Sequence, residues 1–205
     1  MKRSILTLVT VALATAGLGV AEAAPKPPCR IVTDATGDST RGSGLDIVSG
    51  DLASTRTMVT AVFRLAEVTK SNASAPTGQG YYFQFNAGGE TPIYLSYTVT
   101  PTSETFSYGW VDGSINHSLG AAKGVVDVAK KEVRVSAPVG AWGTYGTPRA
   151  GSRLTELGIE TFWVVGAYVN TPETGSNGGG SLQPADDAIG KTYVAGSPSC
   201  VAVGK

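Results

Sequence analysis

A group of acidic residues near the start of the chain has the composition of a calcium site. Asp34, Asp38 and Asp46 fall within 13 residues, and Gly37 lies between the first two. Calcium takes roughly six to eight oxygen ligands from carboxylates, backbone carbonyls and water, and a glycine turn lets carbonyls join the set. The spacing is not that of an EF-hand loop. The alternative is that Asp34 and Asp38 are ordinary turn residues, whose side chains bond to nearby backbone.

The remaining ligands of this site are expected from the far end of the sequence. Cys29 and Cys200 are the two cysteines of the chain, and in an oxidising compartment we expect them to form a disulfide. That bond would hold the C-terminal segment beside the acidic loop, so Asp186 or Asp187 is the expected donor from that segment. The ion would have a structural role. The alternative for the cysteines is a redox-active pair, which usually needs close spacing and an activating environment.

The sequence contains no recognisable catalytic constellation. His117 is the single histidine, which excludes a zinc site built from two or three histidines and makes any Ser-His-Asp triad depend on this residue. Neither a G-x-S-x-G nor an S-x-x-K motif occurs. The stretch 185–192 matches a relaxed phosphate-loop pattern but lacks the preceding strand and following helix, so no nucleotide is expected. Nothing in the spacing selects a glycosidase pair among Glu67, Glu90, Glu104, Glu156 and Glu160.

The first 23 residues have the features of a secretory signal peptide. Two basic residues precede the apolar run Ile5–Val20, and Ala21-Glu22-Ala23 is an A-x-A cleavage site. The expected product is one secreted domain, residues 24–205. Removing Lys2, Arg3 and Glu22 from the 16 basic and 16 acidic residues leaves 14 and 15, so nucleic acid is not an expected partner. No second apolar run is long enough for a membrane span, and the alternative for the first run is an uncleaved anchor.

Short segments of alternating hydrophobicity predict an all-β fold. They are separated by Gly, Ser, Thr and Asn, which is typical of an antiparallel two-sheet β-sandwich of about nine strands. We expect Phe63, Phe83, Phe85, Leu95, Val133 and Val135 in its core. Only Ser152 to Leu157 looks helical. Strands are predicted at 59–65, 81–85, 93–99, 104–111, 123–128, 131–137 and 159–169, the last of them in the middle of a sheet.

One predicted hairpin carries a possible ligand platform. The loop 87–89 suits a three-residue turn, and this register places Phe83 opposite Ile93 and Tyr82 opposite Tyr94. The two tyrosines would then lie together on the outer face, where a sugar ring can stack on them. The alternative is a cross-strand pair that stabilises the sheet or is covered by a loop.

Several stretches together resemble a family. Asp34-Ala35-Thr36-Gly37-Asp38 is followed by Leu45-Asp46-Ile47 and the predicted strand from Met58 to Leu65; later come 135–140, Asp186-Asp187 and Tyr193. This resembles the secreted bacterial β-sandwich domains of the DOMON-like and family-nine carbohydrate-binding-module group. The resemblance implies a non-catalytic, jelly-roll-like sandwich, often with structural calcium, that binds sugars, haem or other partners. The sequence departs from the sugar-binding pattern, because Trp110, Trp142 and Trp163 all fit core positions.

These observations favour a non-catalytic extracellular module that binds a carbohydrate, polymer or protein. Two alternatives come from other classes: a secreted hydrolase with an unrecognised carboxylate site, and a purely structural envelope or matrix protein. Haem is not expected, because Met58 and His117 are the only axial candidates left once Met1 is removed and the cysteines pair.

Overall fold

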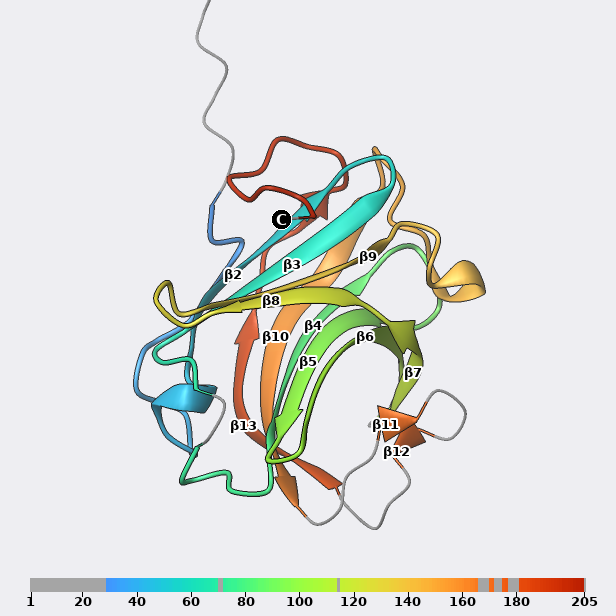
Figure 1. Ribbon diagram of the computed structural model, residues 1–205. Helices are drawn as coiled ribbons and strands as arrows, with labels where there is room; N and C mark the ends of the chain where they lie inside the picture. The colour runs from blue at the N-terminus through green and yellow to red at the C-terminus, as the bar shows by residue number, and fades with distance from the viewer. Residues whose placement is uncertain are drawn as a thin grey trace, which may run out of the picture.

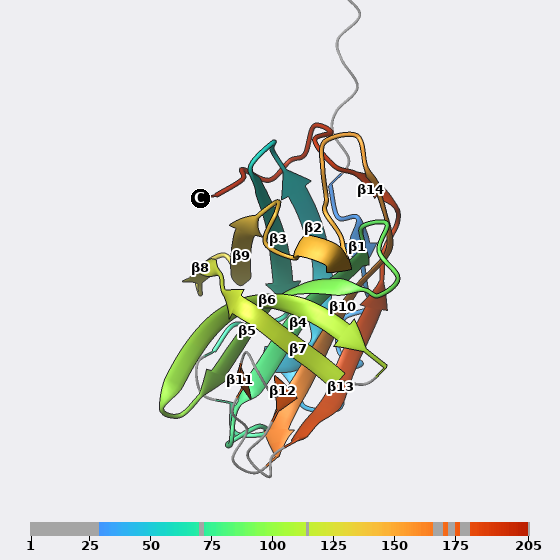
Figure 2. The same ribbon diagram turned by 90° about the vertical axis from the view of Figure 1, so that its right-hand side faces the viewer.

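The computed structural model describes residues 29–69, 72–113, 115–165, 170–171, 175–176 and 181–204. The expected signal peptide therefore lies outside the described residues. As the sequence pattern predicted, the described chain forms a sandwich of two antiparallel sheets packed against each other (Figures 1 and 2). Among the described residues, no helix has the length and apolar character needed to cross a membrane.

The five-stranded sheet has the order β1-β2-β3-β9-β8. Its strands are β1 (Val32–Thr33), β2 (Ile47–Ser54), β3 (Met58–Leu65), β9 (Glu132–Pro138) and β8 (Lys123–Asp127). The larger sheet has the order β13-β10-β4-β5-β6-β7, with β14 paired to one end of β10. Its strands are β4 (Gln79–Asn86), β5 (Ile93–Thr100), β6 (Ser103–Asp112), β7 (Ile115–Ala121), β10 (Arg153–Val165), β13 (Ser181–Ile189) and β14 (Tyr193–Val194). A separate two-stranded ribbon joins β11 (Asn170–Thr171) to β12 (Gly175–Ser176), and two 3₁₀ turns lie at η1 (Ser43–Leu45) and η2 (Gly143–Tyr145).

The core lies between the two sheets and is rich in aromatic side chains. Phe63 of β3 makes edge contacts with Tyr81 and Phe83 of β4, with ring centroids 6.4 Å and 6.0 Å apart. Trp142 is buried and packs on Phe85, and its indole N–H donates to the carbonyl of Tyr94. All six residues that we expected in the core have no exposed surface.

Three of the long strands were not predicted from the sequence. These are β2, β7 and β13, whose sequences contain Gly, Ser, Asp or Pro and lack a clear alternation of apolar and polar residues. These segments become strands because they pair with neighbouring strands, since tertiary context decides strand formation where the local sequence pattern is weak. The stretch that matched a phosphate loop lies partly in β13 and is followed by the short strand β14, not by the helix that such a loop requires.

The predicted helical turn at 152–157 is wrong. Strand β10 begins at Arg153 and runs to Val165. It lies between β4 and β13, so the prediction that the strand at 159–169 is in the middle of a sheet is confirmed for residues 159–165. A bulge between Thr155 and Gly158 interrupts its pairing with β4, and Glu156 has a positive φ of 53°. The bulge changes which residues face the core, so buried Leu154 and Leu157 have a helix-like spacing of three.

The predicted register of the β4–β5 hairpin is also wrong. Phe83 lies opposite Leu95 rather than Ile93, and Tyr82 lies opposite Ser96 rather than Tyr94. The connecting loop is longer than the three residues expected, because pairing resumes only at Phe85 and Ile93. The shift is two residues, and since side chains alternate with a period of two, each residue keeps its expected face.

Candidate metal centre

The acidic loop between β1 and β2 is shaped by its own carboxylates. One oxygen of Asp46 (Oδ2) accepts the backbone N–H of Gly37 at 2.7 Å, and Asp34 Oδ1 accepts that of Ala35 at 2.9 Å. Gly37 has a φ of 94°, a left-handed conformation that glycine adopts without strain. These bonds curl residues 34–38 back toward Asp46, which is itself buried.

The same loop is anchored to the larger sheet at several points. Thr40 donates from both its N–H and its hydroxyl to the carbonyl of Ala185 in β13, at 3.0 Å and 3.1 Å. At the other end of the loop, Tyr81 and Thr161 donate their hydroxyls to the carbonyls of Gly44 and Leu45. The acidic loop therefore rests directly on β13, far from it in the sequence.

Strand β13 contributes a third carboxylate. Its register against β10 shifts between Thr161 and Phe162, which leaves Ala185 as an extra residue and turns Asp186 toward the loop. Asp186 Oδ2 accepts the backbone N–H of Ile47 at 2.8 Å.

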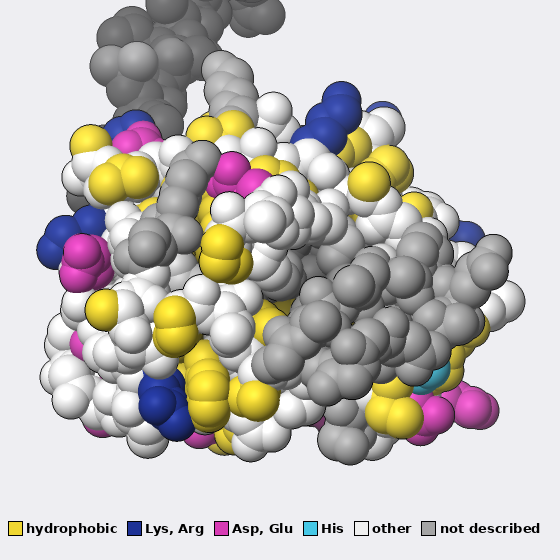
Figure 3. Space-filling view, turned by 60° about the horizontal axis from the view of Figure 1, so that its bottom comes forward, with side chains coloured by type: hydrophobic (Ala, Val, Ile, Leu, Met, Phe, Trp, Pro, Cys, Tyr) yellow, Lys and Arg dark blue, Asp and Glu magenta, His cyan; other side chains and the backbone are white. Residues whose placement is uncertain are grey.

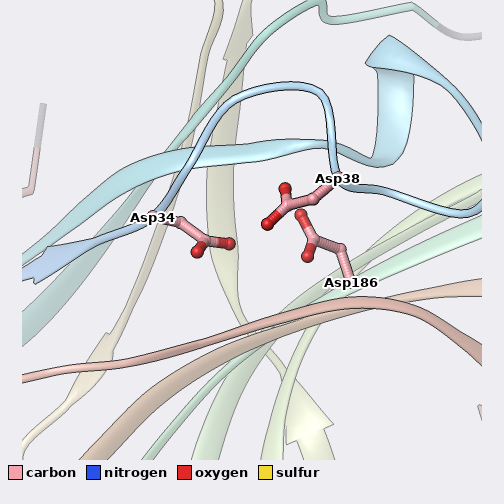
Figure 4. A group of neighbouring side chains, drawn as sticks. All are labelled: Asp34, Asp38 and Asp186. Atoms are coloured by element: carbon pink, nitrogen blue, oxygen red, sulfur yellow. The ribbon is translucent and has the colours of Figure 1, made fainter.

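Asp34, Asp38 and Asp186 converge on one point, as Figure 4 shows. Each offers an oxygen that lies within 4.8 Å of the corresponding oxygens of the other two. Calcium–oxygen distances are about 2.3–2.6 Å, so two ligand oxygens across one ion are separated by up to ~5 Å. The spacing therefore matches one shared hard cation, with backbone carbonyls and water completing its shell.

The electrostatics of this cluster oppose an uncompensated negative charge. Burial, together with the charges of Asp34 and Asp38, raises the pKa of Asp186 to about 6. Burial also raises the pKa of Asp34, and the charges of Asp38, Asp187 and Asp46 act in the same direction. None of the ion pairs found among the described residues joins these carboxylates to a basic side chain.

Two carboxylate oxygens in this region are buried without a hydrogen-bond donor among the described residues. They are Oδ2 of Asp34 and Oδ1 of Asp46, and the whole Asp46 residue is only 3% exposed. A buried oxygen anion without a donor is costly, because it loses its hydration and gains nothing in return. A bound cation is one group that would satisfy it; a water molecule or a proton is another.

Asp187, one of our candidate ligands, is not among the three converging carboxylates, although its charge acts on Asp34. It pairs across the strands with Glu160 of β10, and neighbouring strand residues point to opposite faces. Burial and the charge of Asp187 raise the pKa of Glu160, while a hydrogen bond from the Gln84 amide at 2.9 Å partly offsets this. The sequence analysis named Glu160 as one of five carboxylates without selecting it and did not propose Gln84 as a site residue, because only the strand register reveals that they are neighbours.

The two cysteines lie near each other, although their sulfur atoms are not at disulfide distance. Both are exposed, and the Cys200 thiol lies 3.7 Å from Asp51 Oδ2. Partial burial, Cys29 and Asp51 together raise the pKa of the Cys200 thiol. A raised pKa disfavours the thiolate, the form that a redox-active cysteine requires.

The segment after Cys200 is held on the outer face of the five-stranded sheet. Val201 packs on Ala53 and Val62, and the N–H of Gly204 donates to the Thr60 hydroxyl at 3.1 Å. The blue N-terminal residues and the red C-terminal segment lie close together at this end of the molecule in Figure 1.

Tyr82 and Tyr94 are not an exposed platform. Their rings are 5.1 Å apart in an edge-to-face arrangement, yet both residues are completely buried. They form a small second core with Val111, which Phe162 and Leu182 cover. The outer face of the larger sheet is thus covered at this point, which sequence alternation alone does not reveal.

His117 and Trp163, two further residues named from the sequence, are each held by contacts between planar groups. His117, expected on an exposed loop, lies in β7 and stacks on Trp110, which in turn stacks on Tyr145, at centroid distances of 4.3 Å and 4.4 Å. Trp163 lies under the guanidinium of Arg41 at 3.9 Å.

On the face shown in Figure 3, basic side chains are scattered rather than gathered into a patch. Comparison with family models, with curated proteins and with solved structures finds no match for this chain.

Proposed function

We propose that this protein is a non-catalytic, secreted β-sandwich module that is stabilised by calcium and binds an extracellular carbohydrate, polymer or protein. Asp34, Asp38 and Asp186 are the proposed ligands, and Asp46 holds the loop that carries the first two. The observation that supports this most is the convergence of three carboxylates from distant segments beside buried oxygens that have no donor among the described residues.

The ion's role in this proposal is mechanical. Calcium would tie the acidic loop to β13, and a disulfide between Cys29 and Cys200 would tie the two ends of the fold to each other. The resemblance to DOMON-like domains and family-nine carbohydrate-binding modules belongs to the same proposal. Because the ion would bind the folded protein and not the unfolded chain, it would raise stability in proportion to its concentration over its Kd.

Thermal unfolding of the purified domain in calcium and in chelator tests the metal site. A free calcium concentration of about 100 Kd stabilises by ~2.7 kcal/mol, which corresponds to a rise in Tm of about 5–10 °C for a domain of this size. Asp38→Ala should lose most of this rise, since Asp38 is exposed and its substitution leaves the core intact. The matched control, Glu90→Ala in the exposed β4–β5 loop, should keep it. Equal Tm values in calcium and chelator, with no ion found by elemental analysis, would remove the site from the proposal.

A glycan array, combined with hydrolysis assays on the same panel, tests the proposed task. Binding without turnover is the expected result. Turnover that is abolished by Glu160→Gln would instead support the secreted-hydrolase alternative, because Glu160 and Asp187 are the carboxylates that the strand register places opposite each other.

A further inference from the structure

The outer face of the larger sheet contains a groove that is centred on Glu160 and Asp187. A cavity of about 560 Å³ lies between β10, β13 and the β6–β7 turn, and a second of about 300 Å³ continues along β10 and β13. Both are lined by Gln84, Glu160 and Asp187, so the three residues stand where the two cavities meet. These strands are neighbours in Figure 1.

The charge of this groove is one-sided. Glu160 and Asp187 are directly opposite each other on β10 and β13, and like charges at such a position destabilise a sheet. The larger cavity also has Asp186 in its wall, and none of the described residues that line the two cavities is Lys, Arg or His. The repulsion is relieved when a cation occupies the groove, whereas a neutral ligand would leave it unchanged.

The walls of the groove indicate what kind of cation fits. Phe162, Leu182 and Pro184 line the larger cavity, with Val111 and Ile115 on its other side. A calcium ion would be held by oxygen atoms alone and would gain nothing from these apolar walls. An ammonium group needs only about three acceptors, and the apolar walls suit an alkyl chain behind it.

We propose that this groove binds a primary ammonium group carried on an apolar chain, held between Glu160 and Asp187. The side-chain carbonyl of Gln84 is the proposed third acceptor, because Gln84 lines both cavities and its amide N–H₂ is already engaged by Glu160. The chemistry has two sources: a free alkylamine, or a lysine side chain of a partner protein. The amine would be held by Glu160 and Asp187, neither of which is a proposed calcium ligand, although Asp186 lies in the wall of the larger cavity.

Titration calorimetry and amide chemical shifts, with pentylamine and with a Gly-Lys-Gly peptide, test the proposal in the presence of calcium and again in chelator. Saturable binding of either amine is expected, with pentanol and the acetyl-lysine peptide binding at least about ten-fold more weakly. Similar affinity for both amines identifies a free amine as the source, and tighter binding of the peptide identifies a lysine side chain. Glu160→Gln and Asp187→Asn should each weaken binding about ten-fold, while the control Glu90→Gln leaves it unchanged.

Three results would overturn the proposal. They are absence of saturable amine binding up to about 10 mM, a concentration well above a Kd of 1 mM; equal affinity for the neutral analogues; and competition of calcium for the same residues. The comparison between charged and neutral ligands uses the wild-type protein, so it decides the question even if a variant does not fold. Loss of the proposed calcium site would leave all of these outcomes readable, because the chelator arm measures the groove alone.

Discussion

Asp186→Asn separates the electrostatic cost of the acidic cluster from its proposed benefit. In the metal-free protein, burial and the charges of Asp34 and Asp38 raise the pKa of Asp186 from 3.8 to about 6. A difference of about two pKa units corresponds to ~3 kcal/mol between the charged and neutral forms. Asp186 is only partly buried, so screening by solvent reduces this to on the order of 1 kcal/mol. Asparagine retains an oxygen that can accept the Ile47 N–H, so the substitution removes the charge and keeps the hydrogen bond.

The sign of the effect follows from the direction of the pKa shift. The folded pKa lies above the unfolded one, so the charged Asp186 side chain lowers the free energy of unfolding above about pH 6, and the penalty disappears as the pH falls to about 4. In chelator near pH 7.5, the variant is therefore expected to unfold about 2–4 °C higher than the wild type. Near pH 4 the two proteins should melt together. The control Asp112→Asn removes a charge from the exposed end of β6 and should change neither melting temperature.

In calcium the effect of the same substitution should reverse. The wild type would gain ~2.7 kcal/mol at about 100 Kd, and the variant, lacking one of the proposed ligands, would gain less. Thermal melts under the four combinations of pH and calcium check this. Two results would contradict this reasoning: a lower Tm of the variant in chelator near pH 7.5, or a gain in Tm that persists unchanged near pH 4. Either would show that repulsion among the carboxylates does not control the stability of this cluster.

Two further predictions concern the packing of the sandwich and are checked by urea denaturation. Gly50→Ala should lower the free energy of unfolding by about 1–3 kcal/mol, because the new Cβ would lie 2.2 Å from Ile159 Cδ1 in the facing sheet. The control Gly140→Ala should be nearly neutral, since no atom of a non-adjacent described residue would lie within 4 Å of the new carbon. Equal costs for the two variants would show that the sheets adjust freely. Asp51→Asn should cost about 3 kcal/mol, since the buried Asp51 carboxylate forms an ion pair with Arg64 at 2.5 Å; an unchanged urea midpoint would show that this pair contributes no net stability.

Much of the fold could be predicted because its inner strands alternate clearly. Phe63, Phe83 and Leu95 occupy the core as expected, since one buried face imposes a period of two on each strand. The prediction failed where backbone irregularity breaks that period. The bulge at Glu156 lets Leu154 and Leu157 both face the core at a helix-like spacing, and the long β4–β5 loop moves the hairpin by two residues.

The candidate site was predictable in composition but not in geometry. The clustering of Asp34 and Asp38 in the sequence is visible, and the expected meeting of the chain ends led to Asp186. Which of Asp186 and Asp187 faces the loop depends on a bulge in β13, which local sequence does not reveal. The covering of Tyr82 by Phe162 is likewise a property of the assembled sheet.

The order of strands also has a consequence for how the molecule folds. Strand β10 sits between β4, which precedes it by a long stretch of chain, and β13, which follows it. Val32 near the N-terminal end pairs with Gly50 and, through an isolated bridge, with Gly190. Contacts of such long range form slowly, because each closes a large loop before it gains any stabilisation. Until β13 is in place, β10 presents an open edge that another chain can pair with, so the interval before the sandwich closes is when this protein is most prone to self-association.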